Sequence, residues 1–279
     1  MKNTAQITKA MQMVASSKMA KAQQGALNFR PFAKMAGELM SHLSNDTGDY
    51  KHPLEEKREV RHRVVIIIST DKGLCGALNT NLFREVSKYD TAQTQFIAVG
   101  KKAAQFIART KRKLLAEFSY ADTPKFEEAR AISTFVQKEF LEGRADAVDV
   151  LYTRFINTLT QRPDARELVP MASAESLMSE AREQAGQPAG EPERYDFLFE
   201  PDPVTVMDRL VVYFLHFRVA QLLLEAKASE HSARMVAMKN ATDNANQLVK
   251  QLTLEYNKMR QAAITKELLE ISSAAMALG

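Results

Sequence analysis

Apolar residues recur in alternating steps of three and four along the first part of the chain. This spacing predicts a helix over 1-45 whose narrow apolar seam packs against one partner helix, as in a coiled coil. Pro31 lies off the seam and is expected to kink the helix near its far end. Many seam residues are alanines, so the partner helix can approach closely. The seam consists of Ala15, Met19, Ala22, Ala26, Phe29, Ala33, Ala36, Met40 and Leu43.

The C-terminal part of the chain contains no proline or glycine from Val204 to Leu278. A continuous helix over 204-279 would extend for about 110 Å at roughly 1.5 Å per residue. Residues 210–224 are apolar on most sides, which predicts burial against the middle of the chain. A narrower seam follows at Met235, Met238, Thr242, Ala245, Val249, Leu252, Tyr256, Met259 and Ala263.

Beyond this seam the apolar positions shift by one residue, to Ile264, Leu268, Ile271, Ala275 and Leu278. The shift predicts a different neighbour for the last stretch. Two terminal helices with narrow seams most simply pair antiparallel, with a domain inserted between them. Because the C-terminal helix is about 30 residues longer, some 45 Å of it should lack this partner. We expect the paired seam to end near Ala263 and the single-helix tip to begin at Ile264.

The middle of the chain alternates between strand and helix patterns. A continuous apolar run from Arg63 to Ser69 is typical of a buried central strand. The alternation predicts an inserted, Rossmann-like α/β domain over 60-200 with a small, mostly parallel sheet. Residues 172–194, rich in Ser, Ala, Glu, Gly and Pro, predict a helical turn and a mobile loop. Further strands are expected at 95–99, 114–118, 147–156 and 168–171, and helices at 81–88, 101–109 and 125–141.

Composition narrows the class of protein. No apolar run reaches the roughly 18 residues of a membrane span, and the polar N-terminus lacks a signal-type apolar region, so we expect a cytoplasmic protein. The net charge is only +4, but the N-terminal helix is basic. Such a stripe suits an acidic protein surface or anionic lipid better than nucleic acid, because the chain has no tryptophan that could stack on bases. Its charged residues are Lys2, Lys9, Lys18, Lys21, Arg30 and Lys34, against Glu38.

The loop from Thr70 to Asn79 follows the predicted central strand, where an α/β enzyme would bind a nucleotide. It has neither the three-glycine dinucleotide spacing nor the Gly-Lys-Ser/Thr of a phosphate loop, which favours a structural tight turn. The histidines lack metal-ligand spacing, and the single cysteine, Cys75, is expected to be a small buried apolar residue. No arrangement of residues indicates nucleophilic catalysis. We therefore expect no metal, no cofactor and no enzyme activity.

Three separated parts of the chain carry a family resemblance. Near the N-terminus they are Asn3-Thr4, Ile7 to Ala15 and Ser17 to Met19; in the middle, Gly73 to Gly76 and Leu78-Asn79; toward the C-terminus, Arg234-Met235, Ala237 to Ala245, Ile264 to Glu267 and Glu270-Ile271. In this order they resemble the gamma subunit of the bacterial-type F-type ATP synthase along the whole chain. Members of that family normally begin with a further basic helical segment, ahead of the position that matches Met1.

The resemblance implies that this chain is a central rotor shaft, which couples proton-driven rotation of a membrane c ring to ATP synthesis in an alpha/beta catalytic head. It implies one copy per complex and a non-catalytic role. The implied partners are the hexameric ring of alpha and beta subunits, the epsilon subunit and the c-subunit ring, without nucleic acid. The implied location is peripheral, on the cytoplasmic face of the bacterial inner membrane.

Two groups of contact residues follow from the resemblance. The first matches positions that meet the alpha/beta ring and couple rotation to catalysis, namely Lys9, Met11, Lys18, Arg234, Gln261, Thr265 and Glu267. The second matches the rotor foot near the epsilon subunit and the c ring, namely Gly73, Leu74, Gly76 and Asn79. The residues taken alone leave two alternatives open, an unrelated coiled-coil adaptor and an α/β enzyme with helical extensions.

Overall fold

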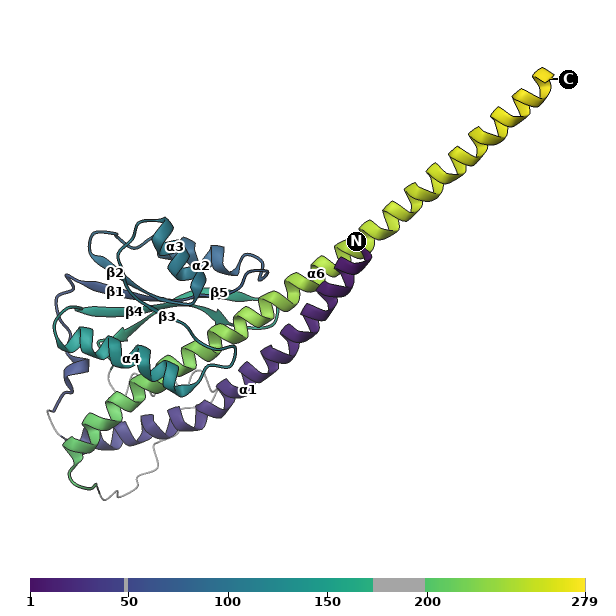
Figure 1. The fold of residues 1–279 in the computed structure, drawn as a ribbon. Coiled ribbons are helices and arrows are strands. Elements are labelled where there is room, and N and C mark those ends of the chain that lie inside the picture. The colour runs from purple at the N-terminus through teal and green to yellow at the C-terminus, as the bar shows by residue number, and fades with distance from the viewer. Residues whose placement is uncertain (48–49, 173–198, 279) are drawn as a thin grey trace.

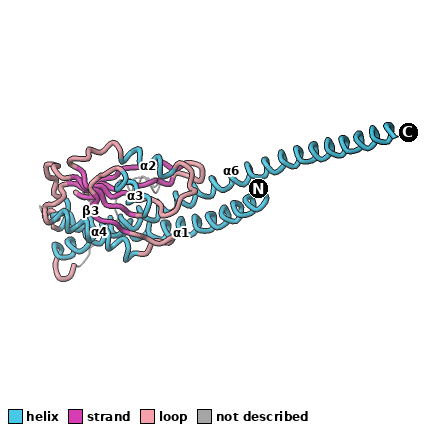
Figure 2. Tube along the Cα trace, turned by 45° about the horizontal axis from the view of Figure 1, so that its top comes forward, coloured by secondary structure: helices cyan, strands magenta, loops and turns pink. Residues whose placement is uncertain are grey.

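Two long helices dominate the computed structural model, which describes residues 1–47, 50–172 and 199–278 (Figure 1). Helix α1 covers Lys2–Asp46 and helix α6 covers Pro203–Leu278. They lie side by side and antiparallel, with the N-terminus beside the middle of α6 (Figures 1 and 2). The predicted antiparallel coiled coil is therefore confirmed. Among the described residues, no helix is both long and apolar enough to cross a membrane.

Small residues bring the two helices close together. Ala15 and Ala22 of α1 are almost fully buried, as are Met238 and Ala245 of α6. A Cβ atom added at Gly25 would lie 3.1 Å from the side chain of Leu224, which is tighter than ordinary contact. Helix α1 stays helical through Pro31 and bends toward its C-terminal end (Figure 1), as expected for a proline that removes one backbone hydrogen bond.

The pairing ends earlier than the seam predicts. The hydroxyl oxygens of Thr8 and Thr242 are 2.7 Å apart. With equal rise per residue in both helices, this register places Lys2 opposite roughly residue 248. The next seam residues are exposed, with 64% of Tyr256 and 72% of Met259 accessible to solvent. The expectation that pairing continues to Ala263 is wrong because the register, and not the period of the seam, decides where α1 ends. We call residues 250–278 the bare end of α6. At roughly 1.5 Å per residue it extends for about 43 Å, which agrees with the expected length of helix without a partner.

The bare end should exchange its amide hydrogens faster than the rest of α6. Its hydrogen bonds are protected only by the helix itself, whereas those around Val211 and Leu215 also require opening of a packed core. Hydrogen exchange of the full chain, followed by mass spectrometry, should show protection in peptides from 210–230 that exceeds that in peptides from 252–274 by about a hundredfold or more. Equal protection in the two regions would contradict this assignment.

A five-stranded sheet lies between residues 60 and 172, with strand order β3-β2-β1-β4-β5. Strands β1 to β4 are parallel to their neighbours, and β5 runs antiparallel to β4. This confirms the predicted α/β fold with a mostly parallel sheet. The strands are β1 Arg63–Ile68, β2 Thr94–Val99, β3 Leu114–Phe118, β4 Ala147–Phe155 and β5 Gln161–Val169, and the helices are η1 Pro53–Glu55, α2 Leu78–Val86, α3 Lys101–Arg109 and α4 Phe126–Leu141.

Each face of the sheet is covered by helices. Helices α2 and α3 pack on one face, where Val65 and Ile67 of β1 are fully buried. On the other face, Ile66 belongs to a core that α4 and α6 complete, together with Met40 and neighbouring residues of α1. The predicted burial of residues 210–224 is therefore largely confirmed, and the two long helices form one layer of the α/β core. The sheet is built directly onto the coiled coil.

Two predicted elements differ in their bounds by more than one residue. Helix α2 begins at Leu78, three residues before the predicted start, because the preceding turn is short. Strand β5 covers Gln161–Val169 and not only 168–171. Its first half contains Pro163 and alternates with charged residues, a pattern that a strand at the edge of a sheet tolerates. Nearly all of the predicted helical turn and mobile loop at 172–194 lies outside the described residues.

Candidate functional site

Three charged residues of α6 lie on one face of the helix, just beyond the part that packs on the sheet. Lys227, Glu230 and Arg234 are spaced three and four residues apart, so their side chains meet. Lys227 is 1% exposed, and its Nζ is 2.9 Å from Oε2 of Glu230. The other carboxylate oxygen of Glu230 is 2.8 Å from Nη2 of Arg234. Glu230, itself 3% exposed, therefore holds two cations.

This group also connects to the sheet and to α1. Asp122, in the loop between β3 and α4, forms an ion pair with Lys18 of α1 and lies 3.9 Å from the ammonium group of Lys227. The hydrogen bond from Lys18 lowers the pKa of Asp122. The Lys227 ammonium group is 4.3 Å from the centroid of the Tyr120 ring. We call Lys18, Asp122, Lys227, Glu230 and Arg234 the charged junction, because it joins both long helices to the α/β domain.

Arg234 connects the charged junction to the loop after β1. Its guanidinium group donates to the backbone carbonyl oxygens of Lys72 at 3.2 Å and of Gly73 at 3.3 Å. A planar guanidinium group with several fixed donors suits adjacent carbonyl oxygens. The loop is therefore held against α6 by its backbone. A change in the position of α6 at Arg234 would be transmitted directly to this loop.

The loop itself is a tight turn, as predicted. Gly76 has a φ of 60° and Leu74 a φ of 63°, and the latter is uncommon for a residue with a side chain. The side-chain amide of Asn79 donates to the hydroxyl oxygen of Thr70 at 2.7 Å. Gly73, by contrast, has no left-handed backbone conformation. The turn leaves the side chain of Leu74 exposed at the surface and buries Cys75, whose pKa is raised by that burial.

At the carboxyl edge of the sheet, backbone amides of α3 already donate hydrogen bonds to side chains of the chain itself. Ala103 donates its amide to the hydroxyl of Ser69 at 2.7 Å, and Lys101 donates to a carboxylate oxygen of Asp71 at 2.9 Å. These are amides of the first turn of α3, where a phosphate would otherwise bind. Within the described ranges, no group of three or more histidine, cysteine, aspartate or glutamate side chains could hold a metal ion.

The other predicted contact residues lie apart from the charged junction. Lys9 is exposed and Met11 half-buried on the paired part of α1. Gln261, Thr265 and Glu267 are all exposed on the bare end. Gln261 is 27 residues beyond Arg234, which corresponds to about 40 Å along the helix. The predicted contact residues are thus distributed along the shaft and do not form one cluster.

Sequence reasoning missed three members of the charged junction, namely Asp122, Lys227 and Glu230. A signal for two of them exists, because Lys227, Glu230 and Arg234 interrupt an apolar helix with alternating charges at helical spacing. Asp122 carries no such signal. Its partners are distant in the sequence and meet only in the folded chain.

Comparison with known proteins places the chain in a family. The family model described as ATP synthase matches residues 1–278. The ATP synthase gamma chain of Opitutus terrae is 46% identical over 278 residues, covering 99% of this chain and 94% of that protein. The gamma chain of Methylacidiphilum infernorum is 44% identical over 283 residues, covering 100% of this chain and 95% of that one.

Chains in solved structures share the fold of this chain. The central stalk and c-ring structure of the Tetrahymena thermophila mitochondrial ATP synthase contains a chain that matches with a TM-score of 0.63 and 26% identity, covering 85% of this chain and 99% of that one. The rotor of the Euglena gracilis mitochondrial ATP synthase matches with a TM-score of 0.54, 18% identity, and coverage of 92% and 99%, which supports the fold alone. By its full-length match to the family model and to these relatives, the chain belongs to the ATP synthase gamma chain family.

Proposed function

We propose that this chain is the central rotor shaft of a bacterial F-type ATP synthase. The single observation that carries the proposal is the 76-residue helix α6, which is paired and packed along its first part and bare along its last. A narrow, bare helix fits the bore of a ring of subunits, while the broad α/β end provides a surface on which torque can act. The family relationship over residues 1–278 supports this role against an unrelated adaptor.

In this proposal the chain transmits rotation and does not itself catalyse. The bare end lies within the hexameric ring of alpha and beta subunits, where Gln261, Thr265 and Glu267 contact it. The opposite end, with the α/β domain, meets the epsilon subunit and the c-subunit ring, and the protein is peripheral to the cytoplasmic face of the inner membrane. Torque passes from the α/β domain to α6 through the apolar core and the charged junction.

The loop after β1 takes a different place in this proposal from the one that the resemblance implies. Arg234 and Gly73 were expected to meet different partners, but hydrogen bonds hold them at one level of the shaft. Arg234 lies on the bare-end side of the segment that packs on the sheet. We therefore assign the loop, with Leu74, Gly76 and Asn79, to the side of the domain that faces the catalytic head, and not to the rotor foot.

Lys18 and Lys9 also differ in what they can contact. Lys18 is already paired with Asp122, so a charge reversal there would repel the loop after β3 within the chain. Lys9 is exposed and, among the described residues, forms no ion pair. Lys9 is therefore the better candidate for an attraction to acidic loops of the ring.

Charge reversal at Lys9 tests this contact. Lys9→Glu should lower ATP-driven proton pumping relative to ATP hydrolysis by about two- to fivefold, since an exposed ion pair contributes on the order of 0.2–1 kcal/mol. The measurement is proton uptake by vesicles that contain the reconstituted complex, and Lys9→Arg, which keeps the charge, is the control. If the two variants pump equally well, Lys9 makes no such contact.

The proposed function itself is tested by reconstitution of a catalytic head with and without this chain. Proton-driven ATP synthesis should appear only when the chain is present. Synthesis at the same rate without it would overturn the proposal. ATP turnover by the isolated chain would instead support the enzyme alternative.

A further inference from the structure

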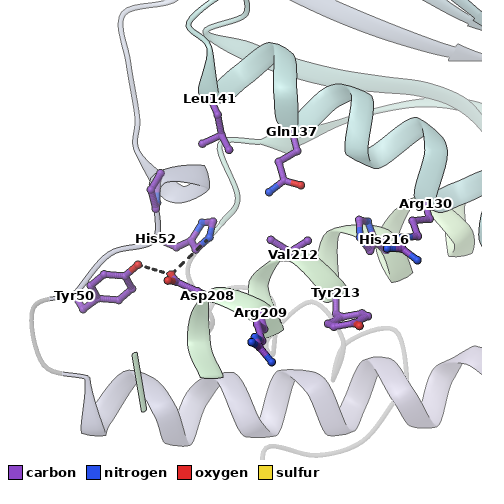
Figure 3. A pocket seen from close by; sticks show the side chains of 11 residues that line it. Tyr50, His52, Arg130, Gln137, Leu141, Asp208, Arg209, Val212, Tyr213 and His216 are labelled. Atoms are coloured by element: carbon purple, nitrogen blue, oxygen red, sulfur yellow. Dashed lines mark hydrogen bonds and ion pairs between the residues drawn. The ribbon is translucent and has the colours of Figure 1, made fainter. Parts of the chain in front are cut away.

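A groove of about 530 Å³ lies between α4 and the first turns of α6 (Figure 3). These turns are at the opposite end of α6 from the bare end. Arg130 and Gln137 of α4 line one side, and Val212 and His216 of α6 line the other. Tyr50 and the residues after it close one end. None of these residues belongs to the charged junction or to the predicted contact groups.

Among the described residues that line this groove, two arginines outnumber one aspartate. Arg130 and Arg209 both line it, and both are exposed. Within residues 1–47, 50–172 and 199–278, neither arginine forms a salt bridge or a side-chain hydrogen bond with another residue. An unpaired guanidinium group on a concave surface fits an anion with several oxygens, because it can donate two parallel hydrogen bonds.

The buried side chain of His216 adds a fixed donor or acceptor to the groove. It is 5% exposed, and its Nδ1 is 2.6 Å from the hydroxyl oxygen of Ser133. Phe126 and Tyr213 pack edge-on against the imidazole ring and hold its plane. Ser133 donates its one hydroxyl hydrogen to the backbone carbonyl oxygen of Ala129, so Nδ1 of the imidazole donates to Ser133 and Nε2 is left as an acceptor. No described residue hydrogen-bonds to Nε2. Burial and the positive charge of Arg130 both lower the pKa of His216.

Asp208 is the one carboxylate among the described residues that line the groove, and it already has two partners. Asp208 accepts a hydrogen bond from the Tyr50 hydroxyl and lies 3.8 Å from Nε2 of His52. The Nδ1 of His52 accepts the backbone amide of Leu54, so its Nε2 is the protonated nitrogen that faces Asp208. Figure 3 shows this cluster at the end of the groove away from Arg130 and His216. An anion beside Arg130 would therefore lie at the other end of the groove from this carboxylate.

We propose that the groove between α4 and α6 binds a monoprotonated phosphate-type anion, held by the Arg130 guanidinium group, with Gln137 as an additional donor and with Nε2 of His216 accepting a hydrogen bond from the hydroxyl of the anion. The anion is either free phosphate or the phosphomonoester of a lipid headgroup. The inference goes beyond the rotor-shaft role and does not depend on it.

Calorimetric titration of the full chain with inorganic phosphate tests the site. Arg130→Gln should weaken phosphate binding by about tenfold, as expected for the loss of a charge-assisted, two-pronged hydrogen bond. Lys138→Gln is the matched control, because it removes the same charge from an exposed position of the same helix that does not line the groove. The control should change binding by less than about twofold. Arg130→Lys keeps the charge but cannot donate two parallel hydrogen bonds, so its loss of phosphate affinity should be intermediate.

A second arm distinguishes the two sources of the anion. The full chain is sedimented with vesicles of phosphatidylcholine, with and without phosphatidic acid. Sedimentation that requires phosphatidic acid and is lost in Arg130→Gln assigns the site to a lipid headgroup, whereas phosphate binding without such sedimentation assigns it to free phosphate. If neither probe binds, or if Arg130→Gln and Lys138→Gln weaken binding equally, the groove is not an anion site and the proposal is wrong.

Discussion

Replacing Glu230 by glutamine is expected to lower the free energy of unfolding by about 3–5 kcal/mol, as is typical when one partner of a buried ion pair is removed. Glu230 is the only acid that contacts both Lys227 and Arg234 among the described residues, and Lys227 is 1% exposed. Without the carboxylate, the Lys227 ammonium group keeps only Asp122 at 3.9 Å and the face of Tyr120. Denaturant unfolding of the full chain measures the loss. The two proteins are compared with the same slope of unfolding free energy against denaturant concentration.

Glu270→Gln is the matched control for this experiment. Glu270 also pairs with a lysine of α6, Lys266 at 3.7 Å, but both side chains are more than half exposed. That variant should change the free energy of unfolding by less than about 0.5 kcal/mol. Equal losses in the two variants would mean that the charged junction contributes no more than an ordinary surface pair.

Removing Lys227 as well should recover part of the loss. In the double variant Lys227→Met, Glu230→Gln, no ammonium group is left in the buried site, and the methionine fills much of the lysine volume. A double-mutant cycle should therefore show strong coupling between the two positions. If the two losses simply add, the two side chains do not interact across the junction.

Replacing Gly100 by alanine is expected to cost about 3 kcal/mol or more of unfolding free energy, because backbone strain and a steric clash act together. Gly100 has a φ of 98°, a conformation that residues with a Cβ rarely adopt. The added Cβ would lie 2.4 Å from the carbonyl oxygen of Ser69, a backbone atom at the end of β1. Relief of this clash requires the turns after β1 and β2 to separate, which would also disturb the Ser69 hydrogen bond to Ala103.

The variant Gly143→Ala distinguishes the cost of backbone strain from the cost of a steric clash. Gly143 has a φ of 71°, but a Cβ there would meet no atom within 4 Å. Its cost should be about 1–2 kcal/mol, from the left-handed conformation alone. Thermal unfolding of both variants provides the comparison. If Gly143→Ala is as destabilising as Gly100→Ala, the close approach between Gly100 and Ser69 is not what makes glycine necessary at position 100.

Local pattern was sufficient to predict most of the architecture. The period of the apolar residues predicted both long helices, and the continuous apolar run at 63–69 predicted the central strand. Predicted bounds for the strands at 114–118 and the helix at 101–109 agree with the structure. These features depend on the conformation of one short segment and on which of its faces is apolar. Neighbouring residues in the sequence determine both. Strand β5 was predicted too short because its charged first half is stable only as an edge next to β4.

Relations between distant residues could not be predicted in this way. The apolar seam of α6 continues beyond the end of α1, so only the Thr8–Thr242 register shows where pairing stops. Lys18 could have faced a partner protein, but the fold places it against Asp122. The sequence by itself determined the two long helices, the α/β alternation and the family resemblance. The tertiary structure alone decided at which seam residue the pairing stops, the members of the charged junction and the groove beside Arg130, because each depends on which surfaces the long-range packing brings together.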